Sequence, residues 1–225
     1  MVTHFQQYLV PTFFLDFTTD EVTEFAETRC QNAATSIEKA VALYYAVRDE
    51  IKYDPFDIEN SRSFLKASSV LQKRTGYCVA KAVLLAAVCR QQNIPARLGF
   101  ADVTNHLSTS KLRKQMGTNL FIYHGYTDIY INDQWVKATP AFNLSLCSRF
   151  NVRPLDFDGT KDSIYHENNA LGQKHMEYVR DRGHFPDVPY DELFAAMHKT
   201  YPKLYEKHSG ATWQNFEEDA SKEAP

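Results

Sequence analysis

The sequence Gly76-Tyr77-Cys78-Val79-Ala80-Lys81-Ala82-Val83-Leu84-Leu85-Ala86-Ala87-Val88 places a cysteine where a turn leads into an almost wholly apolar segment. Apolar residues occupy nearly every position instead of one helical stripe, which predicts a helix that is buried on most sides at the centre of a domain. The N–H groups and the positive dipole end of its first turn favour negative charge, so we expect the pKa of the Cys78 thiol to lie below that of a free thiol. The same N–H groups could stabilise an oxyanion.

A buried cysteine more often behaves as a small hydrophobic residue than as a nucleophile. Cys30, Cys89 and Cys147 fit that structural interpretation. For Cys78 both interpretations stay open at this point, because Gly76 and the start of the helix favour a nucleophile. A cysteine nucleophile also needs a base, and the base needs an orienting group, usually from elements distant in sequence.

A β-hairpin predicted over residues 120–139 supplies both groups. Its two arms are rich in β-branched and aromatic residues and flank the turn residues Asn132-Asp133. With this two-residue turn, Tyr126 pairs with Thr139, and His124 lies diagonally across from Thr139. A shift of one residue would turn Thr139 to the opposite face. The face is too polar for a simple core and suits a cleft; it would carry His124, Tyr126, Asp128, Tyr130, Trp135 and Lys137.

Three motifs in order resemble the transglutaminase-like superfamily over roughly residues 35–145. They are Gly-Tyr-Cys at the start of a buried helix, Asn93-Ile94-Pro95-Ala96-Arg97 before a strand, and a histidine followed by Trp-Val-Lys-Ala-Thr-Pro. The resemblance implies an α+β fold with a papain-like core, in which the central helix packs on an antiparallel sheet and carries the cysteine of a Cys-His-Asp triad. By match to the motifs, Cys78 takes the nucleophile position and His124 the base position.

The chain departs from the family pattern at two places. The usual His-Ala-Trp is His124-Gly125-Tyr126 here, and Thr139 stands where the triad aspartate belongs. A threonine hydroxyl can accept a hydrogen bond from the imidazole and fix its tautomer, but it supplies no negative charge. We therefore expect Thr139 as the third catalytic residue, with Asp128 or Asn143 as alternatives and a plain strand-end threonine as a further one. Other possible supporting residues are Tyr77, Tyr126 and Trp135.

Composition indicates one globular domain. The chain has 225 residues, of which 44% are hydrophobic and 24% charged, with a formal net charge of -3. We expect a core at about 35–145, an N-terminal strand and helix at 8–34, a helical C-terminal extension at 146–205 and a polar tail at 206–225. Nothing indicates binding to nucleic acid or to a membrane. The start lacks a signal-peptide pattern and the cysteines are irregularly spaced, so we expect a cytoplasmic protein; the oligomeric state stays open.

The expected elements around the core follow from local patterns. Residues 104–118 should form a helical or flexible insert that walls the cleft. The run from Asp102 to His106, which follows the strand expected at 97–101, could border the cleft, although a polar strand exit explains it equally well. We expect an edge strand at 9–15, a strand at 97–101, and helices at 21–34, 36–51, 175–182 and 188–200. Residues 67–74 should pack ahead of the turn that carries Cys78.

No cofactor or metal is expected. The eight histidines show no His-Glu-x-x-His pattern, the four cysteines no Cys-x-x-Cys pair, and the chain no glycine-rich nucleotide-binding motif.

The resemblance implies a cysteine enzyme that acts on the amide bond of a peptide or small amide through a thioester. We favour hydrolysis by a peptidase or amidase over transfer of the acyl group to an amine. Two alternatives stay open. One is a weakly active or inactive binding module, because Thr139 replaces the aspartate. The other is an acyltransferase that uses a thioester donor such as acetyl-CoA, for which no basic, glycine-rich phosphate site is visible.

Overall fold

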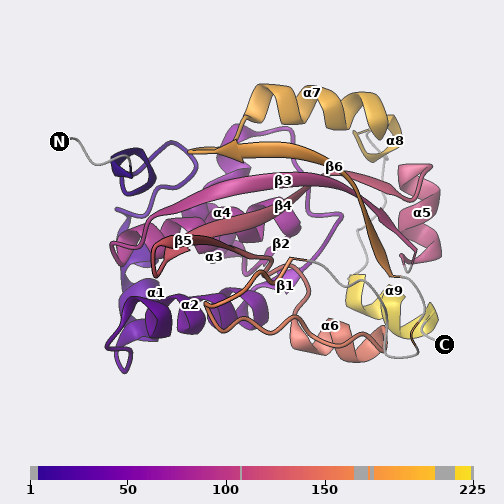
Figure 1. The fold of residues 1–225 in the computed structure, drawn as a ribbon. Helices are drawn as coiled ribbons and strands as arrows, with labels where there is room; N and C mark the ends of the chain where they lie inside the picture. The colour runs from indigo at the N-terminus through magenta and orange to yellow at the C-terminus, as the bar shows by residue number, and fades with distance from the viewer. Residues whose placement is uncertain (1–4, 107, 165–171, 173–174, 206–215, 224–225) are drawn as a thin grey trace.

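The central element of the fold is α4 (Cys78–Gln91), and each of its residues from Cys78 to Arg90 is buried. A computed structural model describes residues 5–106, 108–164, 172, 175–205 and 216–223. In it, α4 lies between a sheet on one side and three helices on the other (Figure 1). These helices are α1 (Asp20–Cys30), α2 (Ser36–Glu50) and α3 (Ala67–Lys73). The prediction of a helix buried on most sides is confirmed, as is the α+β fold class.

The sheet has four antiparallel strands in the order β5-β4-β3-β6. The strands are β3 (Ala96–Asn105), β4 (Leu120–Ile131), β5 (Gln134–Ala138) and β6 (Met176–Phe185). The hairpin register is confirmed, because Ile131 pairs with Gln134. The two turn residues, Asn132 and Asp133, have φ angles of 52° and 61°, as a type I′ turn requires.

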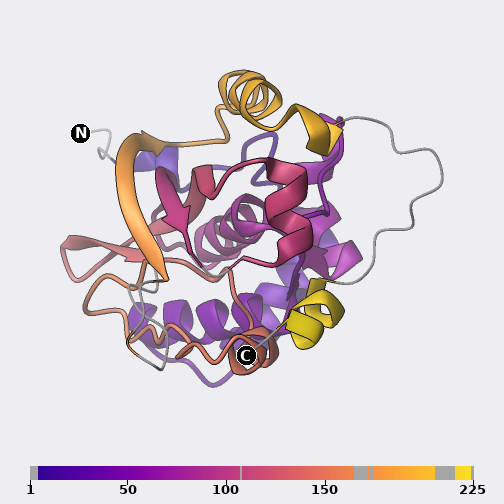
Figure 2. The ribbon, with the colours of Figure 1, turned by 90° about the vertical axis from the view of Figure 1, so that its right-hand side faces the viewer.

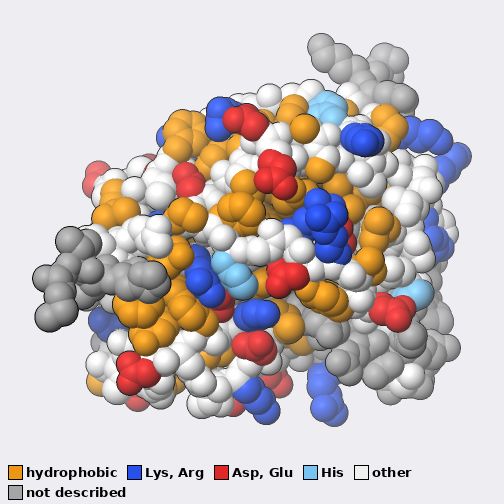
Figure 3. All heavy atoms as spheres, turned by 45° about the horizontal axis from the view of Figure 1, so that its top comes forward, with side chains coloured by type: hydrophobic (Ala, Val, Ile, Leu, Met, Phe, Trp, Pro, Cys, Tyr) orange, Lys and Arg blue, Asp and Glu red, His pale blue; other side chains and the backbone are white. Residues whose placement is uncertain are grey.

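The two faces of β4 have different surroundings. The Thr127 hydroxyl donates a hydrogen bond to Ala82 O in α4, at 2.8 Å, and Gly125 lies against Val79. Side chains alternate along a strand, so Tyr126 and Asp128 point to the outer face, away from α4. Figure 3 shows this side of the molecule, where basic, acidic and histidine side chains gather among hydrophobic ones.

A short parallel pair of strands fixes the turn before α4. The strands are β1 (Lys52–Tyr53) and β2 (Thr75–Gly76), and they follow α2 and α3 respectively. Asp54 N donates to Gly76 O at 3.2 Å, which continues the pairing up to the turn. The position of Cys78 is therefore tied to the ends of two helices.

Helices outside the central layers cover one end of the sheet. Between β3 and β4 the chain forms α5 (Ser110–Met116), which lies in front of α4 in Figure 2. After β6 come α7 (Tyr190–Thr200) and the short α8 (Pro202–Tyr205), and α8 contacts α5. Below them, α6 (Leu144–Arg149) packs beside α9 (Phe216–Glu223).

Among the described residues, no helix combines the length and apolar character needed to cross a membrane. Two short 3-10 helices complete the list: η1 (Gln6–Tyr8) and η2 (Arg62–Leu65).

Several expected elements are wrong. Residues 9–15 form no strand; Phe14 and Leu15 are buried as anchors, and Leu15 N donates to the Thr12 hydroxyl in a local turn. The helix expected at 21–34 ends already at Cys30. Part of the expected polar tail is the helix α9, while residues 206–215 and 224–225 lie outside the described part of the chain.

The helix expected at 175–182 is also wrong, because residues 176–182 belong to β6. This strand pairs along the whole of the β3 edge from Leu98 to Asn105. Pairing with a distant strand outweighs a weak local preference for helix. The C-terminal extension is therefore not purely helical, since it contributes a strand to the central sheet.

Candidate active site

Cys78 is the first residue of α4, directly after the N-cap residue Tyr77. Its side chain is only 7% exposed. Burial raises the pKa of the Cys78 thiol to about 11, although the backbone N–H groups of Gly125, Val79 and Cys78 itself lower it. The expected stabilisation by the helix start is present, but the loss of solvation is the larger effect, so the prediction of a lowered pKa is wrong for this structure.

His124 lies on β4 next to the close contact between the strand and α4. A Cβ atom at Gly125 would lie 2.9 Å from Val79 Cα and 3.2 Å from Val79 N. Only glycine therefore allows the strand this close to the first turn of the helix. As a result, Cys78 and His124 line the same pocket, which has a volume of about 40 Å³ and opens to solvent.

Thr139 follows β5 and is held by its backbone. Its N–H donates to Ser163 O at 2.8 Å, and its carbonyl accepts a hydrogen bond from the Tyr44 hydroxyl at 3.2 Å. Its buried hydroxyl has no hydrogen-bond partner among the residues that the structure describes. Thr139 and His124 line a second, smaller cavity of about 10 Å³. His124 thus lines one cavity together with Cys78 and the other together with Thr139.

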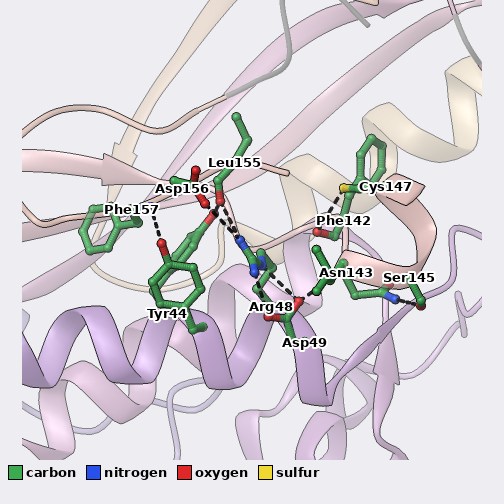
Figure 4. Close-up of polar contacts among 12 residues, drawn as sticks. Tyr44, Arg48, Asp49, Phe142, Asn143, Ser145, Cys147, Leu155, Asp156 and Phe157 are labelled. Atoms are coloured by element: carbon green, nitrogen blue, oxygen red, sulfur yellow. Dashed lines mark hydrogen bonds and ion pairs between the residues drawn. The ribbon is translucent and has the colours of Figure 1, made fainter. Parts of the chain in front are cut away.

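Asn143 holds the backbone near the site. Its amide oxygen accepts a hydrogen bond from Tyr53 N at 3.1 Å, and its amide nitrogen donates to Ser145 Oγ at 2.7 Å. Figure 4 shows Asn143 and Ser145 beside the end of α2, where Arg48 donates to Leu155 O at 2.9 Å. These contacts tie β1 and the segment after β5 to the helix layer.

Asp128 belongs to a separate cluster on the outer face of the sheet. Its carboxylate accepts a hydrogen bond from Arg97 Nε at 2.8 Å and lies 3.3 Å from His184 Nε2. The Tyr126 hydroxyl lies 3.2 Å from the same His184 nitrogen, and Arg97 stacks over the Trp135 ring at 3.9 Å. Burial raises the pKa of Asp128, and Arg97 partly offsets this. The polar face of the hairpin therefore forms a packed cluster around Asp128. The pocket lies elsewhere on β4, at His124.

Local sequence patterns predict only some of the residues that line the pocket. The insert at 104–118 does form a wall, because Leu112 and Met116 of α5 line the pocket. Tyr77 lines it as well. The residues that local patterns did not mark include Tyr53, Pro55 and Ile58 after α2. Three more come from the C-terminal segment: Met197 of α7, Tyr201, and Leu204 of α8. No local pattern marks these three, since they reach the pocket only through the fold of α7 and α8 across the sheet.

Comparisons with known proteins identify the family of this chain. The family model described as "Transglutaminase-like superfamily" matches residues 23–140, more than half of the chain. The chain belongs to the transglutaminase-like superfamily, a family of cysteine-dependent enzymes. No curated protein matches the sequence.

Two solved structures are similar in part. A "Putative Cysteine Protease" from Cytophaga hutchinsonii has a TM-score of 0.48 and 15% identity, over 82% of this chain and 55% of that protein. A "Putative Protease" from Parabacteroides distasonis ATCC 8503 has a TM-score of 0.38 and 14% identity, over 55% of this chain and 23% of that protein. The chain thus spans about half the length of the first and a quarter of the second.

Proposed function

We propose that this protein is a cysteine hydrolase that cleaves an amide bond in a peptide or small amide through a thioester on Cys78. The observation that carries the proposal is the shared pocket, which is lined both by Cys78 at the start of α4 and by His124 of β4. The four cysteines are free thiols, which fits a reducing compartment such as the cytoplasm.

In the first step, the Cys78 thiol must lose its proton. Because burial raises its pKa to about 11, the thiol is protonated at neutral pH. His124 therefore accepts the proton as Sγ attacks the carbonyl carbon, in place of a thiolate formed beforehand. Thr139 lines the second cavity together with His124, and its hydroxyl, which has no partner among the described residues, would have to turn to the imidazole to hold the tautomer. It offers no charge to the imidazolium, so we expect slower attack than with an aspartate.

The following steps regenerate the enzyme. The backbone N–H groups of Cys78, Val79 and Gly125 surround the sulfur and are the candidates to stabilise the oxyanion. The carbon–nitrogen bond then breaks, His124 returns its proton to the leaving amine, and the acyl group stays on Sγ. Water attacks this thioester while His124 takes the water proton, and the acid and the free thiol are released. An amine in place of water would give acyl transfer.

A binding module is the second candidate. Two observations favour it: Thr139 supplies no carboxylate, and burial keeps the Cys78 thiol protonated. In this case the pocket would bind a ligand without turnover.

The test is the rate of Cys78 alkylation by iodoacetamide across pH, measured by mass spectrometry of the labelled peptide. We would compare the unchanged protein with His124→Ala and Thr139→Ala, and with His106→Ala as a control on the exposed surface. For a hydrolase, labelling near pH 7 falls at least about 10-fold in His124→Ala. The rate of that variant should then rise with pH until about 11. Identical profiles for the unchanged protein and His124→Ala would favour the binding module.

A further inference from the structure

The pocket beside Cys78 has apolar walls from several elements. Leu112 and Met116 come from α5, and Met197 and Leu204 from α7 and α8. Phe121 and Ile122 of β4 line it as well. Among the described residues that line the pocket, none is an aspartate, glutamate, lysine or arginine. A charged group placed there would lose water without gaining a partner charge, whereas an apolar group would gain free energy from burial.

We propose that this pocket binds the acyl side of the substrate and selects a bulky apolar side chain, aliphatic or aromatic, next to the scissile carbonyl. This inference rests on the proposed function. The acyl group stays bonded to Cys78 Sγ until water arrives, while the amine leaves early. The apolar pocket that Cys78 lines therefore suits the side chain of the acyl group, which stays bound to the enzyme.

Covalent probes test this preference directly. Peptidyl acyloxymethyl ketones react when Sγ attacks the methylene carbon and the carboxylate leaves, with the thiol proton passing to His124. We would measure Cys78 labelling by probes with leucine, phenylalanine, aspartate or lysine next to the ketone. Burial of a full apolar side chain predicts about 10-fold to 100-fold faster labelling by the leucine and phenylalanine probes than by the charged ones.

Equal rates for all four probes, or faster labelling by a charged probe, would overturn the inference while the proposed function stands. Absence of labelling by every probe, together with the iodoacetamide profile of a binding module, would instead contradict the proposed function.

A pair of variants on α7 tests which side chain sets the preference between the probes. Met197→Ala enlarges the pocket and should shift the preference from leucine to phenylalanine. Phe194→Ala is the matched control, because Phe194 lies on the same helix and packs on Tyr190 and Tyr205 away from the pocket lining. The same shift in both variants would contradict a role for the Met197 side chain in the choice between leucine and phenylalanine.

A second, independent observation concerns the backbone just before His124. The pairing of β3 with β4 is regular up to Ala101 and His124, then shifts, so that Val103 pairs with Phe121. Tyr123 lies in this bulge with a φ angle of 53°, in the left-handed region. A residue other than glycine in this conformation persists only where its surroundings hold it, and such strain is often found at functional sites.

Two side chains replace the missing ladder contacts of the bulge. The Asp102 carboxylate accepts a hydrogen bond from Tyr123 N at 3.0 Å and is itself held by Arg182, at 2.8 Å and 2.9 Å. The Tyr201 hydroxyl accepts a hydrogen bond from Ile122 N at 2.6 Å and donates to Leu120 O at 2.8 Å.

We infer that Asp102 and Tyr201 are positioning residues that set the direction in which His124 leaves β4. Asp102 is fixed from β6 and Tyr201 comes from the end of α7, so both distant segments act on the strand one or two residues before the base. This inference rests on His124 being the base.

The test is a double-mutant cycle on the iodoacetamide rate. Tyr201→Phe keeps the ring but loses both hydrogen bonds, and should slow Cys78 labelling at pH 7 about 10-fold. In the His124→Ala background the same change should have no further effect, because its action passes through the imidazole. Tyr190→Phe is the matched control on α7, where the ring packs on Phe14.

Asp102→Asn and Asp102→Ala give a second route to the same answer. Asparagine keeps an oxygen that can accept from Tyr123 N, so its rate should lie between those of the unchanged protein and Asp102→Ala. Equal losses with and without His124, or a lower melting temperature with an unchanged labelling rate, would show a structural role only. A His124→Ala variant that labels as fast as the unchanged protein would contradict the proposed function itself.

Discussion

Gly125→Ala tests whether the close contact between β4 and α4 controls the site. Alanine is the residue that transglutaminase-like proteins usually have after the histidine, so the change goes toward the family pattern. In this chain, however, the new Cβ would lie 2.9 Å from Val79 Cα, 3.2 Å from Val79 N and 3.3 Å from Val79 Cγ2. Two of these three atoms belong to the backbone and cannot rotate away.

The size of the effect follows from these distances. An ordinary contact begins at 3.4 Å, so the strand and the helix must separate by roughly 0.5 Å. Overpacking of this kind typically costs about 1–3 kcal/mol in the free energy of unfolding. A displacement of about 1 Å at reacting groups can cost about 100-fold in rate, so half of that predicts about 10-fold slower labelling of Cys78.

The assay combines urea unfolding with iodoacetamide labelling at pH 7. The double variant Gly125→Ala/Val79→Ala is the control, because it removes only the contact with Cγ2 and leaves the two backbone contacts. It should not restore the labelling rate. Unchanged stability and labelling in Gly125→Ala would refute the reasoning, and would mean that the strand and helix relax without moving His124 relative to Cys78. Full recovery in the double variant would show that the Val79 side chain, and not the backbone, limits the approach.

Two further predictions concern buried polar groups. Thr139→Asp should raise the rate of Cys78 labelling near pH 7 by about 10-fold, because a carboxylate beside His124 stabilises the imidazolium. Thr139→Val should lower the same rate. Equal labelling rates for the two variants would argue against contact between residue 139 and His124. Lys81 is fully buried and donates to Arg48 O at 2.9 Å and Ile51 O at 2.5 Å. Lys81→Met should lower the free energy of unfolding by about 2–4 kcal/mol, because both carbonyls lose this donor, with exposed Lys52→Met as the control in urea denaturation.

Local patterns predicted the parts of the site that local interactions build. The apolar run after Cys78 specifies a buried helix because every face of it must be covered, and Asn132-Asp133 specifies the register because both residues tolerate positive φ. These two features place Cys78 and His124. The resemblance to the transglutaminase-like superfamily then predicts their roles, and the family match over residues 23–140 confirms the family itself.

Other features depend on contacts between distant segments, and no local pattern predicts them. β6 forms because the β3 edge accepts a partner, not because residues 176–185 favour a strand by themselves. The raised pKa of Cys78 depends on full burial, which α5 and the C-terminal helices complete. From the sequence, Asp102 is only a polar residue near the end of a strand. Its role depends on the hydrogen bonds with Tyr123 N in the bulge and with Arg182 in β6.

The division between the matched core and the rest of the chain has a functional consequence. Cys78, His124 and Thr139 all lie within the matched residues 23–140. The groups proposed to aim His124 and to select the acyl side chain lie partly outside that range, in β6, α7 and α8. Arg182 holds Asp102, and Tyr201 holds Ile122, so a change in the C-terminal segment reaches the base through hydrogen bonds. Chemistry common to the superfamily would therefore be set by the core, and the rate and substrate preference of this protein by the segment that follows it.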